Sequence, residues 1–213
     1  MLTTLANFPK LNLVAKSNIP EMTRLIVHEI GHIVAAAAVS IPTDFLVIDE
    51  AFGAIHHGGY IDEAYRPWLD LPFYRMARIR ILTAGLAAEL AIFGAADLAM
   101  SSEDLSSIAN LLGFAKSDGW MMNTAHCVME NYQPVLPPGA VNAIKKIYPK
   151  IVCAIQGQRH LVDNAHVIPF SAFDDVLLQL SHGHRERALD RTKEECHRRS
   201  IVAKLRGGVG SGV

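Results

Sequence analysis

The sequence predicts a mainly α-helical domain with a small β-hairpin or short sheet. Half of the 213 residues are hydrophobic, which is enough to bury the core of one large domain. Apolar residues recur at helical spacing in several long segments. By contrast, Phe45–Ile48 is a short run of β-branched and aromatic character, and it is the clearest strand candidate. These two patterns predict the fold class.

The first helix is expected to begin at Pro20 and to run to about Ser40. Its residues are apolar nearly all round, which is typical of a buried helix. Phe45–Ile48 follows as a strand. The segment Ala54–Ile61 is either its hairpin partner or a flexible loop.

Four further helices are expected along the chain. Apolar spacing predicts helices from Phe73 to about Phe93 and from about Ser101 to Leu112. Another should extend from about Ala140 to Val162, although Pro149 should kink it or divide it in two. Phe170–Leu180 is predicted to form a short helix.

The segment from His28 to His32 reads H-E-x-x-H within the first helix. Residues four apart on a helix project from nearly the same face, so the two imidazoles can bind one Zn²⁺ ion. Glu29 lies beside that face, where a general base can take a proton from water. Burying these polar groups without a partner would be costly, and a metal ion is the usual solution. The motif predicts a metallohydrolase and favours a peptidase with one Zn²⁺ per chain.

A catalytic zinc site usually has a third protein ligand. Residues 35–38 are alanines, so no His or Glu follows His32 in the manner of the metzincins. The acids of the next long helical stretch are therefore the candidates. They are Glu89, Asp97, Glu103 and Asp104. Asp104 comes at the start of a helix, from which a short carboxylate can reach a cation.

Three blocks of sequence together resemble the peptidase domain of FtsH-type AAA metalloproteases. They are Val27-His28-Glu29-Ile30-Gly31-His32, Ala84-Gly85-Leu86-Ala87-Ala88-Glu89 with Ile92-Phe93-Gly94, and Ser101-Ser102-Glu103-Asp104-Leu105. The resemblance implies that His28, His32 and Asp104 are zinc ligands and that Glu29 is the general base. It places Glu89 near the site as a residue that orients a ligand histidine, or alternatively as a direct ligand.

The chain also departs from the FtsH type. Ile30, Leu86 and Leu90 replace a small residue, an Arg and a Glu of the family pattern, and there is no ATP-binding loop. With the resemblance, the expected fold is a zincin-type helical metallopeptidase domain. Its expected parts are a lead-in at 1–20, a zinc peptidase core at 21–133, a helical remainder at 134–180, and a basic helix with a disordered Gly-rich tail at 181–213.

The expected activity is hydrolysis of peptide bonds in unfolded or exposed polypeptide segments. Phe45–Ile48 is expected to be an edge strand that pairs with an extended substrate. The resemblance is compatible with a homo-oligomer, and it leaves open whether a separate ATPase or adaptor is a partner. Two alternatives remain: a regulatory metalloprotease of the ImmA/IrrE type, which also carries H-E-[IL]-G-H, and a non-catalytic metal-binding adaptor that docks through Arg185–Arg206.

Composition narrows the other expectations. The net charge of −1 gives no general bias toward nucleic acid, and none is expected as a partner. The three cysteines form no C-x-x-C pair, which fits a reducing compartment. The apolar stretches Leu25–Ile48 and Leu82–Met100 contain ionisable residues, so neither is expected to span a membrane. With no secretory signal at the start, a cytoplasmic location is expected.

Overall fold

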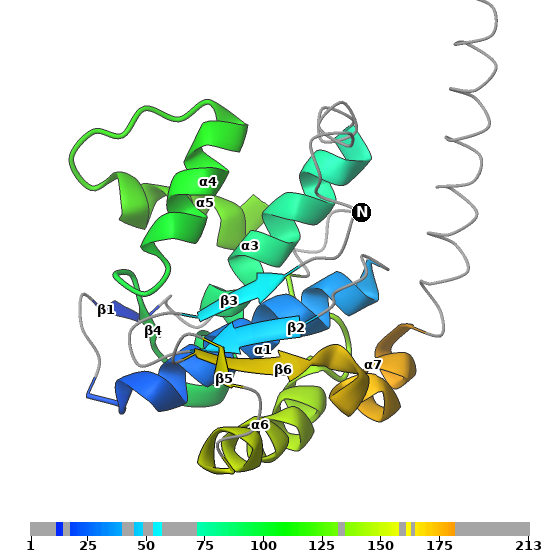
Figure 1. Cartoon of the computed structure of the whole chain (residues 1–213). Coiled ribbons are helices and arrows are strands. Elements are labelled where there is room, and N and C mark those ends of the chain that lie inside the picture. The colour runs from blue at the N-terminus through cyan, green and yellow to red at the C-terminus, as the bar shows by residue number, and fades with distance from the viewer. Residues whose placement is uncertain are drawn as a thin grey trace, which may run out of the picture.

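The structure is a computed structural model of the chain (Figure 1). It describes residues 12–14, 18–39, 45–48, 53–56, 72–131, 135–157, 161–162 and 165–181. This part of the chain is mainly helical, as predicted. Its helices are α1 (Glu21–Ala38), α3 (Pro72–Phe93), α4 (Ser102–Leu112), α5 (Trp120–Asn131), α6 (Ala140–Gln156) and α7 (Asp174–Ser181). The basic segment and Gly-rich tail predicted at 181–213 lie outside the described residues except for Ser181, the last residue of α7.

Helix α1 is the central element of the described structure. It packs against α3, α6, α7 and strand β3 (Gly53–His56), and Figure 1 shows it running beneath the small sheet. Residues 24–36 are all buried, because the helix is apolar on nearly every face. This burial explains why the H-E-x-x-H motif lies inside the molecule.

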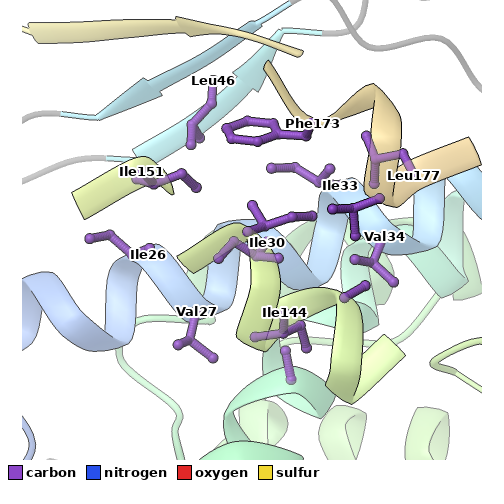
Figure 2. Packing of buried hydrophobic residues seen from close by; sticks show 14 of the residues in the cluster. Ile26, Val27, Ile30, Ile33, Val34, Leu46, Ile144, Ile151, Phe173 and Leu177 are labelled. Atoms are coloured by element: carbon purple, nitrogen blue, oxygen red, sulfur yellow. The ribbon is translucent and has the colours of Figure 1, made fainter. Parts of the chain in front are cut away.

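One hydrophobic core joins α1 to the C-terminal helices and the sheet. Figure 2 shows Ile30 and Ile33 of α1 packed near Leu46 of the sheet and Phe173. All four side chains are fully buried. Burying an Ile or Phe side chain of this kind contributes about 1.5–3 kcal/mol relative to leaving it exposed. The core therefore packs the motif helix against the sheet and the C-terminal helices.

The four-stranded sheet has the order β3-β2-β6-β5. Strand β2 (Phe45–Ile48) pairs antiparallel with β3 on one side and with β6 (Ala165–Pro169) on the other, and β5 (Leu161–Val162) follows β6. Residues 54–56 are thus part of the hairpin partner of β2. The expectation that Phe45–Ile48 is an edge strand was wrong. Strand β2 lies between β3 and β6, so both of its edges are already paired.

The predicted helix at 140–162 was too long. Helix α6 continues through Pro149 but ends at Gln156, before Gly157, a poor helix former. Leu161–Val162 then forms β5, which pairs with β6 and so extends the sheet. Leu161 and Val162 are apolar like the buried residues of the helix, but they pair with the nearby strand β6, which itself pairs with the distant strand β2.

Helix α5 was not predicted, although Met121, Ala125 and Val128 recur at helical spacing in its sequence. In the structure its Thr124, Ala125 and Val128 are fully buried.

A second, two-stranded sheet lies next to the motif helix. Strand β1 (Leu13–Val14) pairs in parallel with β4 (Ala96–Asp97), which follows α3 directly. The side chain of Asn12 also donates a hydrogen bond to the carbonyl of Gly94 at 3.2 Å. These contacts fix the short connection between α3 and α4, which carries Asp97.

None of the helices among the described residues has the length and apolar character needed to cross a bilayer. Among the described residues of the two stretches considered above, many apolar side chains instead lie in the buried core.

Candidate metal centre

Helix α1 places the three functional residues of its motif together. His28, Glu29 and His32 are 3%, 5% and 7% exposed. Their potential ligand atoms all lie within 4.8 Å of one another, so the group could hold a metal ion. Their i, i+1 and i+4 spacing on one helix accounts for this proximity.

The imidazole of His28 fits beneath α3 because residue 85 has no side chain. A Cβ atom built at Gly85 would lie 2.4 Å from Nε2 of His28. One turn further along α1, a Cβ atom at Gly31 would lie 2.4 Å from the backbone oxygen of Ala84. The two glycines therefore let α1 and α3 approach closely at the level of the motif.

We expect Gly85→Ala to weaken zinc binding by about 10–100-fold or more, the loss typical when the orientation of a ligand is disturbed. The added methyl group would occupy the position of the His28 ring. The measurement is zinc affinity by competition with a chelator. Gly31→Ala is the comparison, since its methyl group would meet the backbone oxygen of Ala84 and not an imidazole ring, and it should act chiefly on thermal stability. An unchanged affinity in Gly85→Ala would contradict this account of the ring's position.

Asp104 reaches the two histidines from the first turn of α4. Its Oδ2 atom lies 3.0 Å from Nε2 of His28 and 3.0 Å from Nε2 of His32. In a tetrahedral zinc site with bonds of about 2.0–2.1 Å, the donor atoms lie about 3.3 Å apart. The Asp104 oxygen is thus slightly closer to each Nε2 atom than two ligands around one zinc ion would be.

The other nitrogen of each imidazole has its own acceptor. Nδ1 of His32 donates to the backbone oxygen of Ile81 at 2.7 Å, and Nδ1 of His28 donates to Oε1 of Glu89 at 2.8 Å. A carbonyl oxygen can only accept, so Nδ1 of His32 carries the proton. In neutral rings, both Nε2 lone pairs then face Asp104. Such bonds to the remote nitrogen are the usual support of metal-binding histidines.

Glu89 lies on the side of His28 opposite Asp104, since it binds Nδ1 and Asp104 faces Nε2. Its carboxylate is fully buried. The structure therefore brings Asp104 to the shared face of the two imidazoles and gives Glu89 the position of an orienting residue.

The electrostatics of the cluster require positive charge. Four carboxylates gather here, those of Glu29, Glu89, Asp97 and Asp104, and Arg24 provides one guanidinium. With neutral imidazoles, two Nε2 lone pairs would also oppose the Asp104 oxygen. Either protons on the imidazoles or a divalent cation would relieve this repulsion.

The pKa values reflect the same imbalance. Burial lowers the pKa of His28, but hydrogen bonds to Asp104 and Glu89 outweigh burial and raise it to about 10. In His32, burial is likewise outweighed by Asp104, and the pKa is raised. Burial would raise the pKa of Asp104, yet the two imidazoles hold it well below its usual range. Burial also raises the pKa of Glu29, which makes its carboxylate a better proton acceptor.

Sequence reasoning missed Arg24, which lies one turn before His28 on α1. Its guanidinium is 3% exposed and forms ion pairs with Glu89 and Asp97. Two features of the sequence could have indicated it. One is an arginine within a largely apolar helix, and the other is the presence of Glu89 and Asp97 in the next apolar helical stretch. The sequence prediction did not pair the arginine with either acid.

Other candidates from the sequence lie outside the described residues. They are the basic residues of the segment Arg185–Arg206, through which a non-catalytic adaptor would dock. Comparison of the chain with models of protein families, with curated proteins and with solved structures found no match.

Proposed function

We propose that this chain is a zinc-dependent endopeptidase in which His28, His32 and Asp104 hold one Zn²⁺ ion and Glu29 is the general base. One observation carries the proposal: a single Asp104 oxygen lies 3.0 Å from both Nε2 atoms. The Nδ1 atoms of the same two rings are already bonded to Glu89 and to the Ile81 carbonyl. Two imidazole nitrogens and a carboxylate oxygen thus converge as a three-ligand set.

The donor set suits zinc. Two imidazoles and one carboxylate are the ligand types of catalytic zinc sites, which keep the fourth position open. Bound zinc supplies a Lewis acid that polarises the scissile carbonyl and lets water give up its proton near pH 7. The twofold positive charge also offsets the carboxylates that surround the two imidazoles.

Glu29 is suited to moving that proton. It follows His28 directly on α1, and its ligand atom lies within 4.8 Å of those of both histidines. Burial raises its pKa, so its carboxylate accepts a proton more readily than an exposed one. In the proposed reaction Glu29 takes the proton from water and delivers it to the leaving amine.

Substrate is proposed to approach from the side of Asp104. The Asp104 side chain is 19% exposed, compared with 9% for His32 and 3% for His28. The site therefore reaches solvent beside α4, whereas α1 and α3 enclose its other side. Such a site suits an extended, unfolded segment, which can enter while the folded part of the substrate protein stays outside.

The three sequence blocks support an FtsH-like, zincin-type peptidase working without an ATPase of its own. The placement of Glu89 also bears on the alternative family. A site completed by Glu89 alone would have favoured the ImmA/IrrE type, whereas Asp104 is the acid at the shared Nε2 face. We therefore propose the FtsH-like activity, in the cytoplasm, on polypeptide substrates.

The test is metal content and protease activity of the protein purified without added metal. We expect about one zinc per chain by ICP-MS, cleavage of unfolded casein, loss of cleavage after chelation, and recovery on adding zinc. A protein that takes up no zinc even on reconstitution would contradict the peptidase. Saturated zinc without any hydrolysis would favour the non-catalytic adaptor.

A further inference from the structure

Arg24 is a buried cation with two separate partners. Its Nη2 atom binds Oε2 of Glu89, and its Nη1 atom binds Oδ2 of Asp97. The residue is 3% exposed, and arginine is almost never buried to this extent unless it is paired. Because the guanidinium is a rigid planar fork, it fixes the distance between the two carboxylates that it binds.

The first of these carboxylates supports His28. Oε1 of Glu89 accepts the Nδ1 proton of His28 at 2.8 Å, while Oε2 accepts from Arg24 and from the backbone N–H of Asp97 at 3.1 Å. Both oxygens are thus held by donors. Arg24 binds one oxygen of the same carboxylate whose other oxygen accepts the Nδ1 proton, so its rigid guanidinium fixes the orientation of that acceptor. Arg24 thereby helps to keep the Nε2 lone pair of His28 turned toward Asp104.

The second carboxylate shapes the turn that leads to Asp104. Oδ1 of Asp97 accepts from the backbone N–H groups of Ala99 and Met100, at 2.9 and 3.4 Å. The backbone oxygen of Asp97 accepts a hydrogen bond from the backbone N–H of Ser101. The backbone oxygen of Ser101 in turn accepts from the backbone N–H of Leu105, in the first turn of α4. Asp104 belongs to that same first turn. Holding Asp97 therefore holds the base from which Asp104 reaches the histidines.

We propose that Arg24 is a positioning residue that sets zinc affinity by aligning both sides of the centre. Through Glu89 it orients the histidine on α1, and through Asp97 it orients the carboxylate on α4. It touches neither metal nor substrate in this arrangement. The inference rests on the proposed zinc site, but it concerns residues outside the proposed ligand set.

The test measures zinc affinity of the full chain by competition with a fluorescent chelator. Arg24→Lys keeps the positive charge, but an ammonium group lacks the fork that bridges two carboxylates. We expect Arg24→Lys to weaken zinc binding by about 10–100-fold, the loss typical of residues that orient metal ligands. Asp97→Asn keeps the Oδ1 acceptor for the turn but removes the charge facing Arg24, and it should weaken binding in the same range.

A double variant tests the route through Glu89. If Arg24 acts through that carboxylate, then Glu89→Gln combined with Arg24→Lys should weaken binding by less than the product of the two single effects. The ¹⁵N resonances of the His28 ring in the zinc-loaded protein provide a second readout. They should shift in Arg24→Lys as the Nδ1 hydrogen bond weakens.

Ile144→Ala is the matched control for a general loss of stability. Ile144 is buried on α6 within the apolar core (Figure 2) and is not one of the polar residues of the centre, so its truncation should lower the melting temperature and leave zinc affinity unchanged. Wild-type zinc affinity in both Arg24→Lys and Asp97→Asn, with lowered melting temperatures, would overturn the positioning role while leaving the zinc site intact. Wild-type protein that binds no zinc would instead overturn the proposed function, and the positioning role with it.

Discussion

Glu29→Gln is expected to lower kcat/KM for an unfolded peptide by about 10²–10⁴-fold, the range in which a general acid–base residue contributes. Glutamine has nearly the same shape as glutamate but cannot accept the proton of water. Because Glu29 is not one of the three proposed ligands, the variant should still bind one zinc per chain. The measurement pairs steady-state peptide kinetics with zinc content on the same preparation.

Glu103→Gln is a suitable control, since Glu103 is an exposed acid next to Asp104 on α4. It removes one negative charge near the site without removing a buried group, and its activity should stay near that of the wild type. Loss of zinc from Glu29→Gln would show that Glu29 is a ligand. Retained hydrolysis with bound zinc would show that another group acts as the base.

Asp104→Ala is expected to weaken zinc binding by more than about 100-fold, beyond the 10–100-fold typical of residues that only orient ligands. The substitution removes the oxygen that faces both Nε2 atoms and leaves two imidazoles. Activity should be lost along with the metal. The measurement is zinc affinity by chelator competition, supported by ICP-MS after dialysis.

Glu89→Ala provides the comparison for that experiment. Glu89 contacts Nδ1 of His28, so its removal should weaken zinc binding without abolishing it. The opposite order of effects would reverse our assignment of the third ligand. If Asp104→Ala keeps full zinc and activity while Glu89→Ala loses both, then the carboxylate ligand is Glu89 on α3.

Local sequence patterns were sufficient to predict the parts of this molecule that depend on neighbouring residues. Helix α1 and the convergence of His28 and His32 follow from apolar content and from spacing within one helix. Helices α3 and α4 follow from the same periodicity. The approach of Asp104 to the histidines required more, because it depends on how α4 packs against α1. The order of three sequence blocks pointed to it where spacing alone left four acids open.

The features that were missed depend on contacts between distant segments. Leu161–Val162 was predicted as the end of a helix, whereas it forms β5, which pairs with β6, and β6 in turn pairs with the distant strand β2. For the same reason β2 was expected at an edge. Arg24 was missed because an arginine usually indicates a solvated face, and its partners Glu89 and Asp97 lie on later elements. Burial of an ion pair is a property of the packed fold and not of either sequence segment.

The pairing of β2 with β6 has a consequence for how the chain folds during synthesis. A nascent chain that ends before residue 165 leaves one edge of β2 unpaired, and it lacks Phe173 and Leu177 from the core around α1. Contacts between such distant segments form late, and exposed apolar surface and strand edges favour aggregation in the meantime. The H-E-x-x-H helix leaves the ribosome before these segments and completes its packing only when the last of them follows.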